Sequence, residues 1–144
     1  PQDFIDRLYK MGLDKKLGVE ITGEGAPFIK NSDDNTWSGI TIPWMSIGYE
    51  LKLTPLQILT FYNAVANNGK MVKPKFVKEI RKRGKLVKEI PTEVLNSSIC
   101  SKKTIDMARE MLEGVVENGT ARNLKNDKYK IAGKTGTAQV ANEH

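Results

Sequence analysis

One strongly capped helix constrains the fold of this 144-residue sequence more than any other feature. Thr54 is a favourable N-cap, Pro55 suits the first helical position, and Gln57 completes a capping box. Apolar residues occupy nearly every side of the turns that follow, and Asn67-Asn68-Gly69 supplies residues that end helices. These signals predict a helix from Pro55 to Asn68 that is buried on all sides and forms the structural core.

Two further helices and several short strands are expected around this core. Phe4–Met11 carries apolar residues at helical spacing and stops at Gly12, and a helix from about Lys102 to Asn118 begins after Ser101 as its cap. Leu17–Ile21 is expected to be a short strand or an extended segment. Strands are predicted at Met71–Val72, Phe76–Ile80 and Leu86–Ile90, with a closing strand over Tyr129–Val140. Between Gly25 and Pro43 we expect one long surface loop. The expected class is therefore α+β, mainly helical with a few short strands.

The composition excludes several kinds of site. Cys100 is the only cysteine and His144 the only histidine, so the chain allows neither an intrachain disulfide nor a metal cluster. A Ser-His-Asp or Cys-His catalytic arrangement is excluded on the same ground. No apolar run approaches the roughly 20 residues of a membrane-spanning helix. The beginning at Pro1 has neither a signal peptide nor an initiator Met, and it predicts an excised piece of a longer protein.

The net charge of +6 is concentrated in one segment. Between positions 73 and 88 the only acidic residue is Glu79, whereas the basic residues are Lys73, Lys75, Lys78, Arg81, Lys82, Arg83, Lys85 and Lys88. This run predicts the solvated face of a peripheral hairpin. An alternative is a patch that binds nucleic acid or another anionic surface, but Phe76 is the only aromatic residue available for base stacking.

The four residues Lys134-Thr135-Gly136-Thr137 place an ammonium group and two hydroxyls around one glycine. In an extended segment, a glycine lets the backbone of a ligand come close, and the polar groups could then hold a carboxylate or a carbonyl. A phosphate-binding loop would need a glycine where Lys128 stands. Two interpretations remain: a surface turn without chemistry, and the substrate-binding strand of a serine acyl-transfer enzyme.

The surrounding segments favour the second interpretation, because they resemble the transpeptidase domain of class B penicillin-binding proteins, the monofunctional enzymes that cross-link peptidoglycan. Five segments match the family in its order, and together they span nearly the whole chain: Leu17–Glu24 with Glu20 at the acidic position, Ser46–Gln57 ending in Thr-Pro-Leu-Gln, Tyr62–Gly69, Val115–Ala121 and Ala132–Ala138. The resemblance implies a piece of the penicillin-binding-protein and β-lactamase-like fold, without a cofactor or a metal.

The resemblance also implies a mechanism. A serine attacks the penultimate D-alanine carbonyl of a stem peptide, and the terminal D-alanine leaves. An amine of a neighbouring stem then resolves the acyl-enzyme, whereas β-lactams trap the serine. Lys134 would supply positive potential and help proton movement, and Thr135 and Thr137 would hydrogen-bond the carboxylate of the substrate or drug. The N–H of Thr137 would be one of two oxyanion donors. Gly136 would let the substrate approach the strand.

The family's two other motifs are missing from these 144 residues. No serine is followed by Lys three places on, as in the Ser-x-x-Lys motif of the nucleophile, or by Asn two places on, as in Ser-x-Asn. We therefore expect residues 1–144 to be a transpeptidase domain truncated at both ends, and to be inactive alone. A β-lactam-sensing receptor domain and a non-enzymatic binding module using the hairpin 73–88 remain alternatives.

The partners expected from the resemblance are those of a cell-wall enzyme. They are stem peptides ending in D-Ala-D-Ala, β-lactams, and the glycosyltransferase machinery of division or elongation, with no nucleic acid. The parent would lie on the outer face of the bacterial cytoplasmic membrane, anchored by a segment outside this chain. The fragment itself is expected to self-associate through an open edge of the closing strand.

Overall fold

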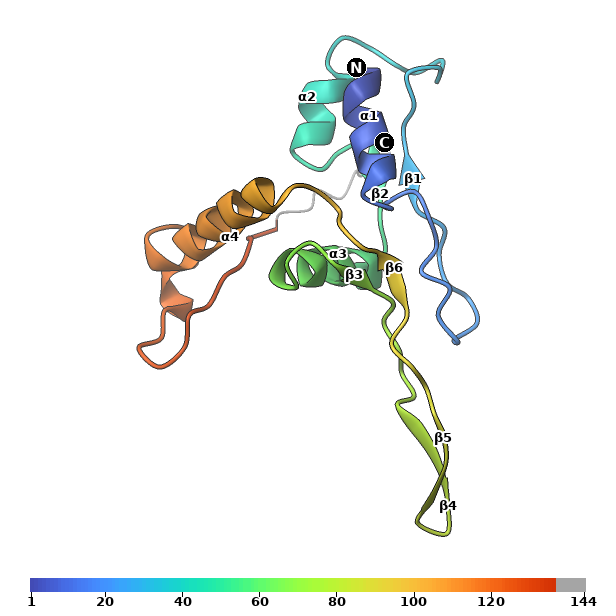
Figure 1. Cartoon of the computed structure of the whole chain (residues 1–144). Coiled ribbons are helices and arrows are strands. Elements are labelled where there is room, and N and C mark those ends of the chain that lie inside the picture. Colours follow the sequence, from blue (N-terminus) through green and yellow to red (C-terminus); the bar gives the residue numbers. More distant parts are fainter. Residues whose placement is uncertain (137–144) are drawn as a thin grey trace, which may run out of the picture. The chain divides into compact units, whose positions relative to one another are not determined.

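The computed structural model describes residues 1–136, in which helices alternate with short strands (Figure 1). The helices are α1 (Gln2–Lys10), α2 (Thr41–Ser46), α3 (Pro55–Ala66) and α4 (Lys102–Glu117), followed by the 3-10 turn η1 (Arg122–Leu124). The strands are β1 (Phe28–Ile29), β2 (Leu51–Lys52), β3 (Met71–Val72), β4 (Glu79–Lys82), β5 (Lys85–Glu89) and β6 (Val94–Asn96). The expected α+β class, mainly helical with short strands, is confirmed.

The chain divides into two compact units, residues 1–101 and residues 102–144. The first unit contains α1 to α3 and all the strands, and the second contains α4 and η1. Each unit has its own buried side chains. The buried apolar side chains of the first are Ile5, Leu17, Met45, Ala64, Val65, Met71 and Ile99, and those of the second are Ile105, Val116 and Ala121.

The helix α3 begins with the predicted capping box. The Thr54 hydroxyl accepts a hydrogen bond from the backbone N–H of Gln57 at 3.2 Å, and the Gln57 side-chain oxygen accepts one from the N–H of Thr54 at 2.8 Å. The Gln57 amide also donates to the carbonyl of Lys15 at 3.2 Å. The cap therefore starts the helix and also joins it to the chain segment that follows α1.

The expected burial of α3 on every side is wrong. One face, formed by Gln57, Thr60 and Ala64, is buried, whereas Ile58 is 44% exposed and Leu59 is 63% exposed. Apolar composition shows that a helix can be buried, but the neighbouring elements decide which of its faces are covered. In residues 1–136, the neighbouring elements cover the face of α3 that contains Gln57, Thr60 and Ala64.

Three antiparallel pairs of strands make up the sheets. β1 pairs with β2, β3 with β6, and β4 with β5. The predicted hairpin forms as β4 and β5, but the bounds predicted for its first strand are wrong, because β4 begins at Glu79 and not at Phe76. The strands β1, β2 and β6 were not predicted. Their two or three residues each are too few for a sequence pattern, and a partner strand stabilises them. A side-chain contact joins β6 to α1, because the Asn96 amide donates to the Lys10 carbonyl at 2.9 Å. The segments that follow β6 and α3 are also joined, because the Ile99 N–H donates to the Gly69 carbonyl at 2.9 Å.

Of the two forms expected for Leu17–Ile21, a short strand or an extended segment, the strand does not form. Instead, the carboxylate of Glu24 accepts hydrogen bonds from three successive backbone N–H groups, at 2.5 Å from Leu17, 2.9 Å from Gly18 and 3.3 Å from Val19. A side chain thereby satisfies the backbone donors that a ladder would otherwise use. The segment is a carboxylate-capped loop.

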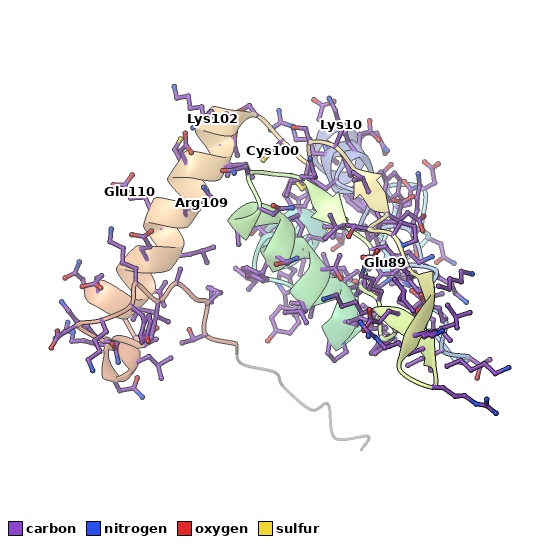
Figure 2. The ribbon with its side chains drawn as sticks, turned by 60° about the horizontal axis from the view of Figure 1, so that its bottom comes forward. Lys10, Glu89, Cys100, Lys102, Arg109 and Glu110 are labelled. Atoms are coloured by element: carbon purple, nitrogen blue, oxygen red, sulfur yellow. The ribbon has the colours of Figure 1, made fainter. Side chains whose placement is uncertain are left out.

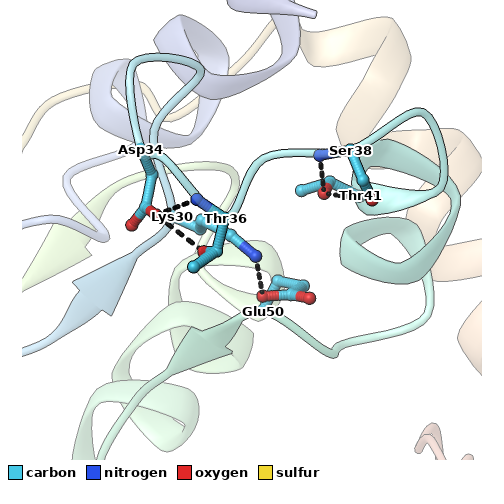
Figure 3. A network of polar contacts seen from close by, with 6 residues as sticks. All are labelled: Lys30, Asp34, Thr36, Ser38, Thr41 and Glu50. Carbon is cyan, nitrogen blue, oxygen red and sulfur yellow. Dashed lines mark hydrogen bonds and ion pairs between the residues drawn. The ribbon is translucent and has the colours of Figure 1, made fainter.

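The long loop expected up to Pro43 is also wrong, because it contains β1 and the first half of α2. A polar network holds the remaining turn (Figure 3). The ammonium group of Lys30 lies 2.9 Å from Glu50 Oε2, and Asp34 Oδ1 accepts hydrogen bonds from the backbone N–H and the hydroxyl of Thr36 at 2.9 and 2.6 Å. The segment is therefore a structured turn.

The second unit is built on the predicted amphipathic helix α4. Ile105 and Val116, at opposite ends of the helix, are buried. Beyond the helix the chain turns back, and the N–H of Ala121 donates to the carbonyl of Val115 at 3.1 Å. Such a bond satisfies one of the free carbonyls at the helix C-terminus. The turn brings the following residues back toward α4.

Candidate functional site

The segment that contains Lys134 returns along α4 without forming a strand. The closing strand predicted from Tyr129 is therefore wrong for residues 129–136, and its remaining part lies outside the described residues. A strand needs a neighbour that completes its ladder, and the described part of this unit contains no other strand. The open strand edge expected for self-association is likewise not formed by residues 129–136.

Two contacts hold the segment against α4. The backbone N–H of Gly133 donates to the carbonyl of Leu112 at 3.1 Å. The ammonium group of Lys130 lies 3.6 Å from the carboxylate of Glu113, with both side chains well exposed to solvent. The direct backbone contact fixes the position immediately before Lys134. The exposed ion pair adds little, since such pairs contribute on average less than about 1 kcal/mol.

The structure places three of the four predicted site residues at the surface. Lys134, Thr135 and Gly136 are exposed, and Thr137 lies outside the described residues. The Lys134 ammonium donates to the carbonyl of Thr135 at 2.6 Å, and within residues 1–136 no carboxylate lies within ion-pair distance of it. Its positive charge is therefore available to an anionic group that approaches the segment.

Gly136 stands in open space. A Cβ built on it would meet no atom of the described residues within 4 Å, so crowding inside this unit does not explain the glycine. Gly133, three residues earlier, is equally free. A requirement for glycine at position 136 would therefore come from whatever approaches the segment from outside.

Thr120 is a neighbour of the motif that sequence reasoning did not identify as a site residue. Its hydroxyl oxygen lies 3.4 Å from the hydroxyl oxygen of Thr135. Two of the segments matched by resemblance, Val115–Ala121 and Ala132–Ala138, thus lie side by side at this point. Both segments resemble parts of the same family, and this shared resemblance was the sequence signal that they could lie close together. Neither segment alone indicates the contact.

A close backbone contact shapes the turn that carries Thr120. A Cβ on Gly119 would lie 2.8 Å from the carbonyl oxygen of Val115 and 2.9 Å from its Cα, which is too close for any side chain. The guanidinium of Arg122 donates to the carbonyl of Asn118 at 3.0 Å. The chain can therefore fold tightly over the end of α4 and bring Thr120 to Thr135.

Other kinds of site find no support in the described part of the chain. Residues 1–136 contain no group of three or more His, Cys, Asp or Glu side chains that could hold a metal ion. None of the helices in the same range is both long and apolar enough to cross a membrane. Cys100 is a free thiol, and its partial burial raises the pKa of that thiol. A raised pKa lowers the thiolate fraction and with it the reactivity.

Comparison with known proteins identifies the same family that the series of matched segments resembles. The family described as penicillin binding protein transpeptidase domain matches residues 1–144. The chain belongs to the penicillin-binding protein transpeptidase family. Among curated members, it is 34% identical over 150 aligned residues to penicillin-binding protein PbpB of Mycobacterium tuberculosis. It is 32% identical over 144 residues to peptidoglycan D,D-transpeptidase FtsI of Buchnera aphidicola.

The chain spans only about a fifth of the length of these transpeptidase-family relatives. The alignment with PbpB covers 99% of this chain and 22% of the relative, and the alignment with FtsI covers 97% and 23%. This chain therefore aligns with only part of each of these relatives.

Solved structures of the family confirm the fold. Penicillin binding protein 3 from Mycobacterium tuberculosis, complexed with ampicillin, superposes with a TM-score of 0.67 at 34% identity, over 81% of this chain and 25% of that one. Penicillin-binding protein 2B from Streptococcus pneumoniae has a TM-score of 0.80 at 22% identity, over 97% of this chain and 24% of that one. The helices and short strands described above are therefore a partial transpeptidase fold.

Proposed function

We propose that the protein to which this chain belongs is a serine-type peptidoglycan D,D-transpeptidase, and that residues 1–144 form an incomplete part of its catalytic domain. The observation that carries the proposal is the match of the transpeptidase family over residues 1–144. Further support comes from a relative, 32% identical, that is named a peptidoglycan D,D-transpeptidase. In that reaction a serine forms an acyl-enzyme with one stem peptide and expels its terminal D-alanine. An amine of another stem peptide then attacks the acyl carbonyl, which forms the cross-link and frees the serine.

This chain would contribute one wall of the active site. The ammonium group of Lys134 carries a charge that no carboxylate of the described residues compensates, and it is exposed. It would attract the terminal carboxylate of a D-Ala-D-Ala stem and help to move protons among the active-site hydroxyls. The hydroxyl of Thr135 would hydrogen-bond that carboxylate. Thr137 is proposed to do the same, and its N–H would stabilise the oxyanion.

Gly136 and Thr120 would shape the same wall. A Cβ at Gly136 meets nothing in the described residues, so the benefit of glycine there would be the close approach of a substrate backbone. Thr120, whose hydroxyl lies 3.4 Å from that of Thr135, would orient the Thr135 side chain. A positioned hydroxyl loses less conformational freedom when it binds a ligand.

β-Lactams are the expected inhibitors. A homologous structure, 34% identical, is complexed with ampicillin. The nucleophile would be supplied by residues outside this chain, since no Ser-x-x-Lys or Ser-x-Asn occurs in it. We propose that the parent acts on the outer face of the bacterial cytoplasmic membrane, held by an anchor outside this sequence, with a division or elongation glycosyltransferase as partner. No cofactor is required.

Covalent labelling with a fluorescent penicillin tests the proposal. The full-length protein should form an acyl adduct, and the 144-residue chain alone should form none. In the full-length protein, Lys134→Ala should slow acylation by roughly 10–100-fold, which is the effect of losing one or two hydrogen bonds to a charged group. Lys128→Ala removes another exposed lysine of the same unit and is the matched control.

Two outcomes would contradict the proposal. Full-length protein that resists labelling while it is folded would remove the transpeptidase assignment. Labelling of the 144-residue chain would show that a nucleophile lies within it. A β-lactam-sensing receptor domain would also label, and it is distinguished by failing to cross-link stem peptides in an assay with purified peptidoglycan precursor.

A further inference from the structure

The hairpin formed by β4 and β5 has different charges on its two faces. On one face, Glu79 and Glu89 are cross-strand partners, and Glu79 also holds Arg81 through a 2.7 Å contact between Oε1 and Nε. Figure 2 shows Glu89 on this hairpin. Residues that alternate along a strand share a face, so Glu79 and Arg81 lie on the same side. This face contains both signs of charge.

The other face contains cations and apolar side chains. Ile80 is paired with Lys88, and Lys82 is paired with Lys85. Directly paired residues lie on the same face, and Ile80 and Lys82 are two apart. Three lysines therefore gather on this face, and no glutamate or aspartate is among its residues.

The tip of the hairpin has a defined shape. Arg83 and Gly84 have φ values of 48° and 78°, the left-handed conformations of a two-residue turn that matches the twist of the strands. An open surface hollow lies there, lined by Lys82, Arg83, Lys85 and Val87, all of them exposed. Three cations thus lie beside one another at the tip, on the backbone that the turn fixes.

No acidic side chain of residues 1–136 compensates these cations. Like charges placed directly across a ladder destabilise it, and the Lys82–Lys85 pair is such a case. Within residues 1–136, Lys82, Arg83 and Lys85 form no ion pair, although Arg81 beside them forms one with Glu79. An anion seated between the lysines would relieve this repulsion.

We propose that the hairpin tip is a binding site for phosphate groups of a linear polyanion, with Lys82, Arg83 and Lys85 as its ligands. The proposal is independent of the transpeptidase function, because the residues and the unit differ from those of the Lys134 segment. A chain of phosphates fits because it offers repeated negative charges to a row of cations and requires no other recognition.

Two other anionic partners fit the tip less well. Nucleic acid bases are recognised by stacking on aromatic side chains, and none of the residues from Lys82 to Glu89 is aromatic. Insertion into a lipid surface uses Trp, Phe or Leu at the inserting end, whereas the turn consists of Lys, Arg, Gly and Lys. Charge alone therefore carries the recognition.

Binding of long-chain inorganic polyphosphate to the 144-residue chain tests the proposal, with salt titration and calorimetry as readouts. We expect binding that weakens as salt rises. The triple variant Lys82→Gln/Arg83→Gln/Lys85→Gln should bind at least tenfold more weakly. It should also reduce the slope of log K against log salt by roughly 2, since each lost contact to a single-stranded polyanion removes about 0.7.

The matched control is Lys10→Gln/Lys15→Gln/Lys16→Gln, which removes the same net charge from exposed positions of the same unit. This control should retain wild-type binding. As a second measurement, NMR shift changes on adding polyphosphate should be confined to residues 78–89. An equal loss in the control, or shifts spread over the whole unit, would overturn the proposal.

The choice of polyanion is tested in the same assay. Phosphatidylglycerol vesicles and single-stranded DNA are added at equal phosphate concentration. We expect neither to bind more tightly than polyphosphate. Tighter binding to vesicles would identify a lipid surface as the partner, and tighter binding to DNA would identify nucleic acid; either result overturns the assignment.

Discussion

The ammonium nitrogen of Lys30 lies 2.9 Å from Oε2 of Glu50, and the two side chains differ in their access to water. The Lys30 side chain is 8% exposed, whereas that of Glu50 is 29% exposed. Lys30 directly follows β1 and Glu50 directly precedes β2. The ion pair therefore joins the two ends of the segment that connects these strands. The buried partner depends on the pair more than the exposed one does.

This asymmetry predicts unequal effects of removing either charge. Glu50→Leu leaves the buried Lys30 ammonium without a partner, so it should lower the free energy of unfolding by about 3 kcal/mol. Lys30→Met leaves a carboxylate that can reach water, and it should cost about 1 kcal/mol. Urea denaturation of the 144-residue chain measures both values.

The double variant Lys30→Met/Glu50→Leu is the control for this prediction. It removes both charges, so it should be more stable than Glu50→Leu alone. If the double variant lost the sum of the two single effects, the contact would not couple the residues. The importance of the ion pair for this loop would then be wrong.

The cap of α3 predicts a second effect on stability. Thr54→Ala removes the hydroxyl that accepts from the Gln57 N–H, and it should lower the free energy of unfolding by about 1 kcal/mol. Thr54→Ser keeps an oxygen at the same place and should stay close to wild type. Amide exchange at Gln57 should become faster in the alanine variant alone; unchanged exchange there would contradict the assignment of the cap.

Local signals in the sequence were sufficient for the longer helices. Thr54, Pro55 and Gln57 fix the start of α3 by contacts within one turn, and these contacts are present. The apolar spacing of α4 likewise leads to buried Ile105 and Val116. Such features depend on neighbours only a few positions away, which a sequence displays directly.

The predictions that were wrong depend on contacts between residues that cannot be read from the sequence. Leu17–Val19 has a strand-like composition, but the carboxylate of Glu24 takes its N–H groups. Ile58 and Leu59 look like core residues, but burial depends on what covers them. Residues 129–136 also have a strand-like composition, yet the described part of their unit offers no partner strand.

The sequence motif names the residues of the candidate site, but it does not indicate how they are arranged. The motif series identified Lys134, Thr135, Gly136 and Thr137, and the structure describes the first three at the surface. The contact between Thr120 and Thr135 depends on a turn in which Gly119 passes close to Val115. A sequence shows that a glycine is present there but not which backbone atom it approaches.

The turn at Asp34 predicts a dependence on pH. The hydroxyl and the backbone N–H of Thr36 hydrogen-bond the carboxylate, and they hold the pKa of Asp34 below its ordinary value of 3.8. A depressed pKa means that the ionised form is favoured in the folded turn, so this contribution to stability is present above pH 3.8. It is lost as the pH falls through the lower, folded-state pKa.

An NMR titration of the Asp34 carboxyl carbon tests this relation. Thr36→Val removes the hydroxyl, which is the largest cause of the shift, so the pKa of Asp34 should rise toward 3.8. Thr36→Ser retains a hydroxyl and should keep the pKa low. An unchanged pKa in the valine variant would show that the hydroxyl does not stabilise the carboxylate.

Substitution of alanine for glycine should change the free energy of unfolding in opposite directions at two positions of the second unit. Gly114 lies within α4, and a Cβ there would meet no neighbouring atom within 4 Å. Gly114→Ala should therefore raise the free energy of unfolding by about 0.5–1 kcal/mol, because alanine loses less backbone entropy in a helix.

Gly119→Ala should instead destabilise the unit, because its Cβ would lie 2.8 Å from the Val115 carbonyl oxygen and 2.9 Å from the Val115 Cα. Backbone atoms must shift to relieve such contacts, so we expect a loss of about 1–3 kcal/mol. The shift would also move Thr120 away from Thr135. In the full-length protein, Gly119→Ala should therefore slow penicillin acylation, whereas Gly114→Ala should not. Thermal melting followed by circular dichroism gives the stabilities, and equal melting temperatures for the two variants would contradict the tight turn.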